Sequence, residues 1–318
     1  MSASSLRSVV TVTLNPTIDK VMEVSGLHIG GHLPGRLRSR TPSGKAFNVS
    51  RALGLLGIDN TAAGWMGRDA MEFFESAARA ARVTPRFVPL EDATRENITL
   101  LDPVSRTETH IRDAGPSVAP EDIGRLRSEL SILSHGQAVI VFSGSTPPGL
   151  SAEGFGELVD LCIERGARVA VDTSREPIRV AAGKALWLIK PNLLELSDAT
   201  GRPLPDEAAV LNAARELNER IPIVVVTAGE RGAYCFAEGR GFHGHVSLPR
   251  EHIRSTVGCG DAFMAGFLAG MCFDESDVES AFRNALTVAA SSALQELPAV
   301  FSPEDLQVVA PRVELASC

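Results

Sequence analysis

Residues 137–172 read QAVIVFSGSTPPGLSAEGFGELVDLCIERGARVAVD, and this stretch decides the fold class. The apolar runs at 137–142 and 168–172 have the β-branched content of buried strands, and the segment 152–165 between them has the spacing of an amphipathic helix. A strand, a helix and a strand in this order form one unit of a parallel sheet. The stretch therefore predicts parallel strands with helices packed on them.

The same alternation extends along most of the chain. Amphipathic segments near 45–57 and 206–219 are predicted helices, and further short β-branched runs are predicted buried strands. We therefore expect an α/β fold that is doubly wound, with a mostly parallel sheet flanked by helices on both faces. The further strand runs are VVTVTL at 9–14, LWLI at 186–189 and IVVVT at 223–227.

Two stretches interrupt this alternation, residues 20–42 and residues 96–112. Both alternate polar and apolar residues, which predicts strands with one exposed face. We expect them to form a small β-sheet lid inserted into a single domain of residues 1–318, because no repeat or low-complexity linker separates them from the rest. Such a lid would cover a ligand, and its unpaired edges would pair with a second copy in a homodimer.

The composition limits the classes of function. The 318 residues carry a formal net charge of -8, with 44% hydrophobic and 22% charged residues. A nucleic-acid partner is not expected, because phosphate contacts need clustered Lys and Arg. The N-terminus has no uninterrupted hydrophobic run, and the five scattered cysteines form no CxxC pair. These features predict a cytoplasmic protein with reduced thiols and no membrane partner.

A local signal for chemistry lies at residues 255–271, STVGCGDAFMAGFLAGM. Gly258 and Gly260 precede an apolar helix expected to begin near Asp261, so unpaired N–H groups and the positive end of the helix dipole converge there. A carboxylate beside such an anion site can take a proton from an attacking hydroxyl while the N–H groups stabilise phosphoryl charge. Taken alone, the segment is more simply a helix with Asp261 as its N-cap.

Further motifs, in a fixed order, resemble the ribokinase-like (PfkB) superfamily of carbohydrate kinases. Its C-terminal signature D-T-x-G-A-G-D is similar to residues 255–261, and its N-terminal signature G-G-K-G-x-N-x-A is similar to residues 43–50, SGKAFNVS, where two glycines are replaced. The resemblance covers nearly the whole chain. It implies that Asp261 is the catalytic base, that the backbone of Gly258, Cys259 and Gly260 is the anion hole, and that Gly44, Lys45 and Asn48 lie against the sugar.

Two more motifs resemble the branch that contains 1-phosphofructokinase and tagatose-6-phosphate kinase. Residues 13–19, TLNPTID, are similar to its T-L-N-P-A-x-D opening, and residues 94–97, TREN, are similar to its T-R-x-N element. The resemblance implies that Asp19 binds sugar hydroxyls and that Arg95 binds a phosphate already on the acceptor, for which its forked guanidinium is suited. His32 stands near the position of a phosphate-binding lysine in some relatives.

The expected acceptor is therefore a phosphorylated ketose. Fructose 1-phosphate, converted to fructose 1,6-bisphosphate, is the first expectation, followed by tagatose 6-phosphate and fructose 6-phosphate. An unphosphorylated sugar or a nucleoside comes last.

The remaining motifs concern ATP and Mg²⁺. KPNLLE at 190–195 is similar to the family's N-x-x-E element, which implies a magnesium role for Glu195 through water; alone, the same residues would cap a helix. TAGERGA at 227–233 is similar to the family's nucleotide turn, although alone it would be a hairpin turn. The expected ATP-binding residues are Lys190, Asn192, Thr227, Gly229, Gly232 and Asn284, with Thr287 beside the last.

Other classes of protein fit these residues less well. A dinucleotide-dependent oxidoreductase needs G-x-G-x-x-G directly after the first strand, where this chain has Asn15, Pro16 and Thr17. The G-x-x-x-x-G-K-[ST] motif of P-loop kinases is absent from the sequence. A non-catalytic sugar sensor with the same fold would not need a base at the helix start. An ATP-dependent sugar kinase remains as the prediction.

Overall fold

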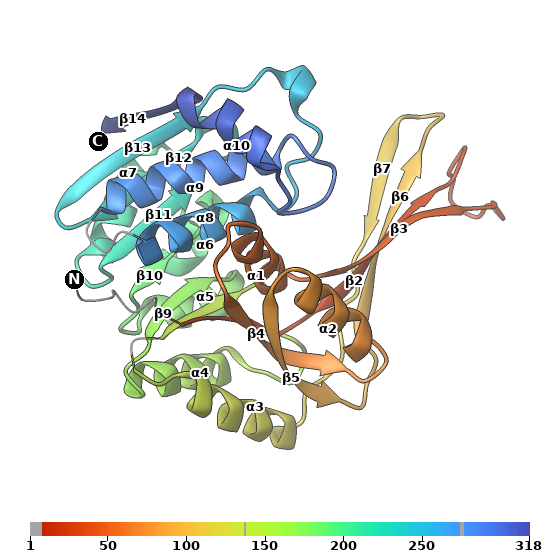
Figure 1. Cartoon of the computed structure of the whole chain (residues 1–318), viewed down its shortest axis with the longest axis horizontal. Coiled ribbons are helices and arrows are strands. Elements are labelled where there is room, and N and C mark those ends of the chain that lie inside the picture. The colour runs from red at the N-terminus through yellow and green to blue at the C-terminus, as the bar shows by residue number, and fades with distance from the viewer. Residues whose placement is uncertain (1–7, 137, 274–276) are drawn as a thin grey trace.

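The computed structural model describes residues 8–136, 138–273 and 277–318, and within them ten strands form one large sheet (Figure 1). Its order across the sheet is β14-β13-β12-β11-β10-β9-β8-β1-β4-β5. These strands are β1 (Val9–Thr13), β4 (Asn60–Gly67), β5 (Val83–Leu90), β8 (Val139–Ser143), β9 (Arg168–Asp172), β10 (Leu188–Ile189), β11 (Ile223–Thr227), β12 (Ala233–Ala237), β13 (Arg240–Val246) and β14 (Val313–Ser317).

The strands from β11 to β5 are parallel, whereas β12, β13 and β14 continue the sheet in antiparallel pairs. The mostly parallel sheet predicted from the sequence is thereby confirmed. The strands β4 and β5 were not among the predicted runs. Strand β4 is rich in alanine and glycine, and β5 contains Pro85 and Pro89, which only an edge strand accommodates easily.

Helices cover both faces of the sheet, as expected (Figure 1). Alternate residues of one strand enter different cores: Val224 and Val226 pack with α3 to α7, whereas Val225 packs with α1, α8 and α9. The helices are α1 (Lys45–Leu55), α2 (Met71–Ala80), α3 (Pro120–Leu133), α4 (Ala152–Glu164), α5 (Arg175–Ala182), α6 (Leu193–Thr200), α7 (Glu207–Asn218), α8 (Cys259–Phe273), α9 (Val278–Ser292) and α10 (Pro303–Val309).

The strand order changes direction at β1. From β1 the chain builds β4 and β5 on one side, and it later builds β8 to β11 on the other side. Connections leaving the carboxyl ends of β1 and β8 therefore diverge, which opens a crevice of the kind that binds ligands in doubly wound sheets. Three of the predicted motifs, TLNPTID, KPNLLE and TAGERGA, lie at the carboxyl ends of β1, β10 and β11.

A second, smaller sheet projects from this body, at the right of Figure 1. It has the order β3-β2-β6-β7, in which β2 and β6 are parallel and the outer pairs are antiparallel. We call it the lid sheet. It confirms the predicted small sheet. Its first strand begins closer to the body than expected, because only three residues separate β1 from β2. Its strands are β2 (Thr17–Glu23), β3 (Arg36–Ser43), β6 (Arg95–Asp102) and β7 (Thr107–Ile111).

Candidate active site

The expected base, Asp261, lies in the first turn of α8. The helix begins at Cys259, so Asp261 is its third residue and not its N-cap. Gly258, just before the helix, has a φ of 82°, and a Cβ atom there would lie 2.6 Å from Cβ of Pro298. Only glycine fits this conformation and this space without strain. The glycine therefore lets the chain turn tightly into the start of α8.

Asp261 is held by a residue from the other signature motif. Nδ2 of Asn48, in α1, donates to its Oδ2 at 2.9 Å, and Asp261 is only 5% exposed. The hydroxyl of Ser43 donates to Oδ1 of Asn48 at 3.5 Å, which orients the amide so that its N–H groups face Asp261. A serine in place of the family's glycine thus has a use in this chain.

Two lysines and a buried aspartate form the floor of the site. Oδ2 of Asp172, at the end of β9, lies 3.0 Å from Nζ of Lys190, and its Oδ1 lies 3.3 Å from Nζ of Lys45. Asp172 is 1% exposed and also accepts from the hydroxyl of Ser143. Nζ of Lys45 reaches Glu195 as well, at 3.4 Å from Oε1. Both ammonium groups are therefore fixed by carboxylates at the carboxyl edge of the sheet.

Asp261 and Asp172 differ in the direction of their pKa shifts. Burial and the negative charge of Asp172 raise the pKa of Asp261 to about 7, against the opposing hydrogen bond from Asn48. Burial would raise the pKa of Asp172 too, but the charges of Lys190 and Lys45 hold it below its usual value. The pKa of Lys45 is raised, mainly by Asp172. One carboxylate is thus a permanent anion, whereas Asp261 can exchange a proton near neutral pH.

The ammonium group of Lys190 also reaches the start of α8. A Cβ atom built on Gly260 would lie 3.6 Å from Nζ of Lys190. The positive charge of Lys190 and the positive end of the α8 dipole therefore lie side by side. An anionic group placed here would meet both, with Asp261 directly beside it.

Asn192 and Glu195 form the capping arrangement that the sequence left open. The side chain of Asn192 accepts from the N–H of Glu195, and Oε2 of Glu195 accepts from the N–H of Asn192, each at 2.9 Å. The other oxygen of Glu195 faces Lys45, and the side chain is buried. Glu195 thus caps α6 with one oxygen and borders the site with the other.

The predicted nucleotide turn lies next to this cap. The N–H of Thr227 donates to the carbonyl of Pro191 at 3.0 Å, and Thr227 forms a parallel bridge with Asn192. Strands β11 and β12 pair antiparallel, so the turn that contains Gly229 and Gly232 is a hairpin connection. The hairpin and the ATP interpretation are compatible, because the turn leaves the sheet at the edge where Lys190 stands.

Asn284 is placed differently from the other expected ATP residues. Its Nδ2 donates to the carbonyl of Gly266 at 2.6 Å, which joins α9 to α8. With Thr287 it also lines a cavity of about 410 Å³ between α9 and α10. No contact in the described part of the chain links Asn284 to Lys190 or Thr227.

Asp19 and Arg95 lie on the lid sheet beside the end of β1. Oδ1 of Asp19 accepts from Asn97 at 3.0 Å, which leaves its other oxygen for a ligand. Gly44, where β3 enters α1, has a φ of 127°, and a Cβ atom there would lie 3.4 Å from Cα of Pro16. The two signature segments near the N-terminus therefore meet closely where the lid sheet joins the body.

The guanidinium of Arg95 makes three hydrogen bonds to backbone carbonyls. It donates to Asn15 at 3.0 Å, Pro16 at 3.2 Å and Asp113 at 3.0 Å, and burial lowers its pKa. A guanidinium has five N–H donors, so two remain for another acceptor. Arg95 thus holds the β1–β2 turn in place and keeps capacity for an anion.

The last two expected site residues are His32 and Cys259. His32 is exposed in the loop between β2 and β3, and no contact among the described residues joins it to Asp19 or Arg95. The thiol of Cys259 points to the carbonyl of Ser255, and burial, followed by the charge of Asp261, raises its pKa to about 11. The prediction was a small buried thiol, whereas Cys259 is only half-buried in the structure.

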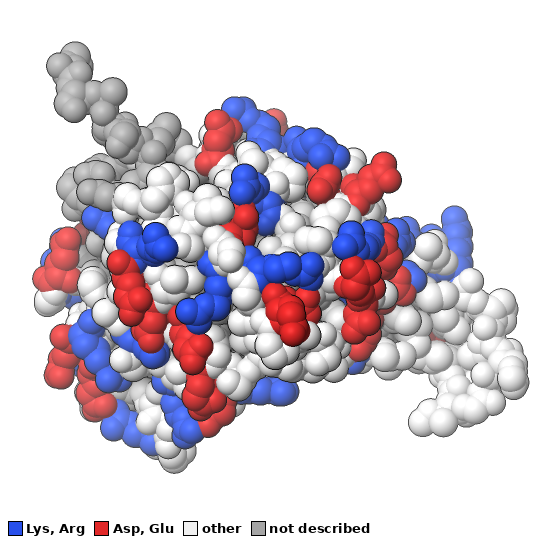
Figure 2. Space-filling view, turned by 90° about the horizontal axis from the view of Figure 1, so that it is seen from below, with Lys and Arg blue, Asp and Glu red and all other residues white. Residues whose placement is uncertain are grey.

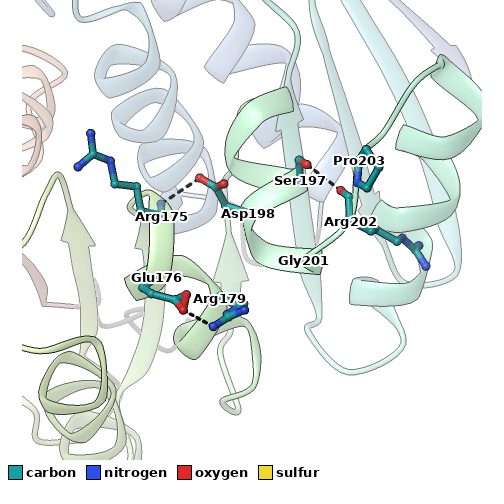
Figure 3. Close-up of a pocket in the computed structure, with 8 residues that line it drawn as sticks. All are labelled: Arg175, Glu176, Arg179, Ser197, Asp198, Gly201, Arg202 and Pro203. Carbon is teal, nitrogen blue, oxygen red and sulfur yellow. Dashed lines mark hydrogen bonds and ion pairs between the residues drawn. The ribbon is translucent and has the colours of Figure 1, made fainter.

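A cavity of about 500 Å³ lies outside this cluster, between α5 and α6 (Figure 3). Its charges are engaged locally: Arg179 pairs with Glu176, and the N–H of Arg175 donates to Asp198. None of the expected site residues lines it. The lining residues are Arg175, Glu176, Arg179, Ser197, Asp198, Gly201, Arg202 and Pro203.

Sequence reasoning did not identify Asp172 as a site residue. The signal was present, because RVAVD is a buried strand that ends in a lone carboxylate at the ligand-binding edge of the sheet. A charge in that position is costly unless it is paired. Its partners, Lys45 and Lys190, lie where β3 meets α1 and where β10 leads into α6. No local sequence pattern shows that these segments come close to Asp172.

Together, the fold and the site define a class of protein. A carboxylate that titrates near neutral pH, lysines beside a helix N-terminus and a lid sheet at the switch point of a doubly wound sheet are suited to phosphoryl transfer onto a small molecule. The protein is a small-molecule kinase.

Residues 13–305 match the family described as pfkB family carbohydrate kinase. The chain is 32% identical over 312 residues to 1-phosphofructokinase of Escherichia coli, covering 97% of this chain and 98% of the relative. It is 29% identical over 287 residues to 1-phosphofructokinase of Bacillus subtilis, covering 90% and 92%. A crystal structure of phosphofructokinase-2 from Escherichia coli superposes with a TM-score of 0.88 at 26% identity, covering 96% and 98%. The chain belongs to the pfkB family of carbohydrate kinases.

Proposed function

We propose that the protein transfers the γ-phosphoryl group of ATP to the 6-hydroxyl of fructose 1-phosphate, giving fructose 1,6-bisphosphate and ADP. The observation that carries the proposal is the buried carboxylate of Asp261, oriented by Asn48 beside the start of α8 and Lys190. The choice of acceptor is supported by the relatives named 1-phosphofructokinase and by the TLNPTID and TREN motifs.

In the proposed reaction, Asp261, the start of α8, Lys190 and Asp172 have separate roles. Asp261 takes the proton of the acceptor hydroxyl as its oxygen bonds to the γ-phosphorus, and the bond from that phosphorus to the β,γ-bridging oxygen breaks. Negative charge spreads over the transferred phosphoryl oxygens and the leaving ADP. The N–H groups at the start of α8 and the ammonium of Lys190 stabilise that charge. Asp172 keeps both lysines in place throughout.

Magnesium is the expected companion of the triphosphate. No described residues form a group of three or more His, Cys, Asp or Glu that could hold a metal ion. Magnesium needs few protein ligands because it keeps several of its waters. The oxygen of Glu195 that faces the site suits such a water-mediated contact. When bound, the ion would neutralise phosphate charge, while the side chains supply orientation and proton transfer.

Initial rates with MgATP and a panel of acceptors test the proposal. We expect kcat/KM to be highest for fructose 1-phosphate, ahead of tagatose 6-phosphate and fructose 6-phosphate, with fructose far behind. A higher value for another phosphosugar would change the acceptor and keep the kinase. A higher value for an unphosphorylated sugar or nucleoside would remove the phosphosugar assignment altogether.

The lid sheet is also proposed to join two copies of the chain. One of its faces carries Met22 opposite Leu37 and Leu100, and Ile98 opposite Ile111. Leu37 and Ile111 are each 52% exposed. The lid sheet, at the right of Figure 2, shows a largely uncharged surface toward its tip, whereas charges of both signs are interleaved over the body. An apolar sheet face of this kind favours a homodimer.

No helix among the described residues combines the length and the apolar character that crossing a membrane requires.

A further inference from the structure

A histidine of β13 binds the turn that follows β11. Nε2 of His243 lies 2.9 Å from the carbonyl oxygen of Arg231, within the turn of residues 227–233. A carbonyl oxygen can only accept a hydrogen bond, so this ring nitrogen carries a proton and donates it. His243 is paired with Tyr234 in the ladder between β12 and β13. The bond therefore connects β13 to the turn that precedes β12.

The ring of His243 is held in place by Tyr234. The two ring centroids lie 4.8 Å apart, with an interplanar angle of 31°. Tyr234 is only 4% exposed, and its hydroxyl donates to Oε1 of Glu207, at the start of α7, at 2.5 Å. Packing against a fixed partner restricts the rotation of the histidine side chain. The donor is thus oriented before any ligand binds.

The hydrogen bond from His243 fixes the peptide unit between Arg231 and Gly232. The N–H of this unit donates to the carbonyl of Gly229 at 3.0 Å, and its carbonyl accepts from His243. Gly232 has a φ of 83°, and a Cβ atom there would lie 2.0 Å from the carbonyl oxygen of Gly244 in β13. Glycine accepts φ of either sign, so the peptide unit could also take the opposite orientation. His243 holds it in the one observed.

This peptide unit borders the proposed nucleotide site. Thr227, at the start of the turn, forms a parallel bridge with Asn192, and Lys190 stands two residues before Asn192 at the same edge of the sheet. A triphosphate whose γ-phosphate meets Lys190 therefore has the turn as a close neighbour. The partial negative charge of a carbonyl oxygen that faced a phosphate would repel it. The orientation held by His243 directs the carbonyl of Arg231 toward β13 instead.

We propose that His243 is a positioning residue for nucleotide binding, which acts by holding the carbonyl of Arg231 away from the triphosphate. The proposal rests on the proposed function, because it places ATP against the turn of residues 227–233. The ligand is a nucleoside triphosphate with its magnesium ion. The expected acceptor residues Asp19 and Arg95 lie on the lid sheet, so binding of the acceptor does not depend on this turn.

The test compares His243→Phe and His243→Gln with wild type. Phenylalanine keeps a ring against Tyr234 and loses the donor, whereas glutamine places an amide N–H at a similar reach. We expect His243→Phe to raise KM for MgATP roughly fivefold, the scale of one lost hydrogen bond. In this variant kcat and KM for fructose 1-phosphate should stay within about twofold of wild type. His243→Gln should stay within about twofold in all three values.

The control is His245→Phe. His245 lies on the same face of β13, opposite Glu314 of β14, and no hydrogen bond from it to the turn is found in the described part of the chain. The role of His243 would be overturned by an unchanged KM for MgATP in His243→Phe, by an equal rise in His245→Phe, or by an equal rise in KM for both substrates. It would also be overturned by an equal loss in His243→Phe and His243→Gln, because the ring and not its donor would then matter.

The affinity for MgATP is also measured without an acceptor, by isothermal titration calorimetry. His243→Phe should bind MgATP roughly fivefold more weakly than wild type. If wild type binds MgATP and turns over a phosphosugar while His243→Phe binds equally well, only this inference fails. If wild type binds MgATP and turns over no phosphosugar, the acceptor assignment fails, and the difference in affinity still decides the role of His243. If wild type does not bind MgATP, the proposed function and this inference fail together.

Discussion

Replacing Asp261 with asparagine tests the raised pKa of the expected base through protein stability. The pKa of this carboxyl rises from 3.8 to about 7 on folding. Between these values the folded protein keeps a proton that the unfolded chain has released, so the free energy of unfolding falls as pH rises. At 1.36 kcal/mol per pH unit, the wild type should lose about 3 kcal/mol at this group between pH 5 and pH 8. Asparagine cannot titrate and avoids the loss.

The assay is urea unfolding of both proteins at pH 5 and at pH 8. The stability of Asp261→Asn relative to wild type should increase by about 2–3 kcal/mol between the two values. Asp102→Asn is the control, because hydrogen bonds, first that from the N–H of Gly26, lower the pKa of Asp102 to about 2. Both the folded and unfolded values of Asp102 lie below pH 5, so its effect should be equal at the two pH values.

The same variant tests catalysis. Turnover should fall at least a hundredfold, because an amide cannot take the hydroxyl proton. KM should change little, since the new carbonyl oxygen can still accept from Asn48. An identical stability difference at both pH values would refute the raised pKa. Retention of more than about a tenth of wild-type turnover would refute the general base.

In the wild type, kcat/KM should rise with pH to a plateau above about 7. Asn48→Ala should move this rise to higher pH, because the lost hydrogen bond had lowered the pKa of Asp261. A rise at the same pH in both proteins would contradict the role of Asn48. Glu195→Gln should raise the Mg²⁺ concentration for half-maximal rate severalfold without loss of stability, because glutamine still caps α6. An unchanged magnesium titration would leave Glu195 with capping alone. Ile111→Asp should give a monomer by light scattering where wild type is a dimer, and a wild-type monomer would remove the dimer proposal.

Local patterns were sufficient for the α/β class and for a helix that begins near Asp261. Strands such as IVVVT and helices such as α4 are indicated by the spacing of apolar residues within a few positions, and this spacing can be read directly from the sequence. The sequence did not predict β4 and β5, because alanine, glycine and proline carry little strand signal. Pairing of β4 with β1, and of β5 with β4, holds them in the sheet.

The sequence by itself determined the chemical parts of the site: a carboxylate after two glycines, an asparagine in the N-terminal motif and lysines before helices. Only the tertiary structure decided how they work together. Asn48 and Asp261 are 213 positions apart. The carboxylate that pairs with Lys45 and Lys190 is Asp172, at the end of β9. A pKa depends on burial and on charges within a few ångströms, and both arise only when distant segments pack against each other.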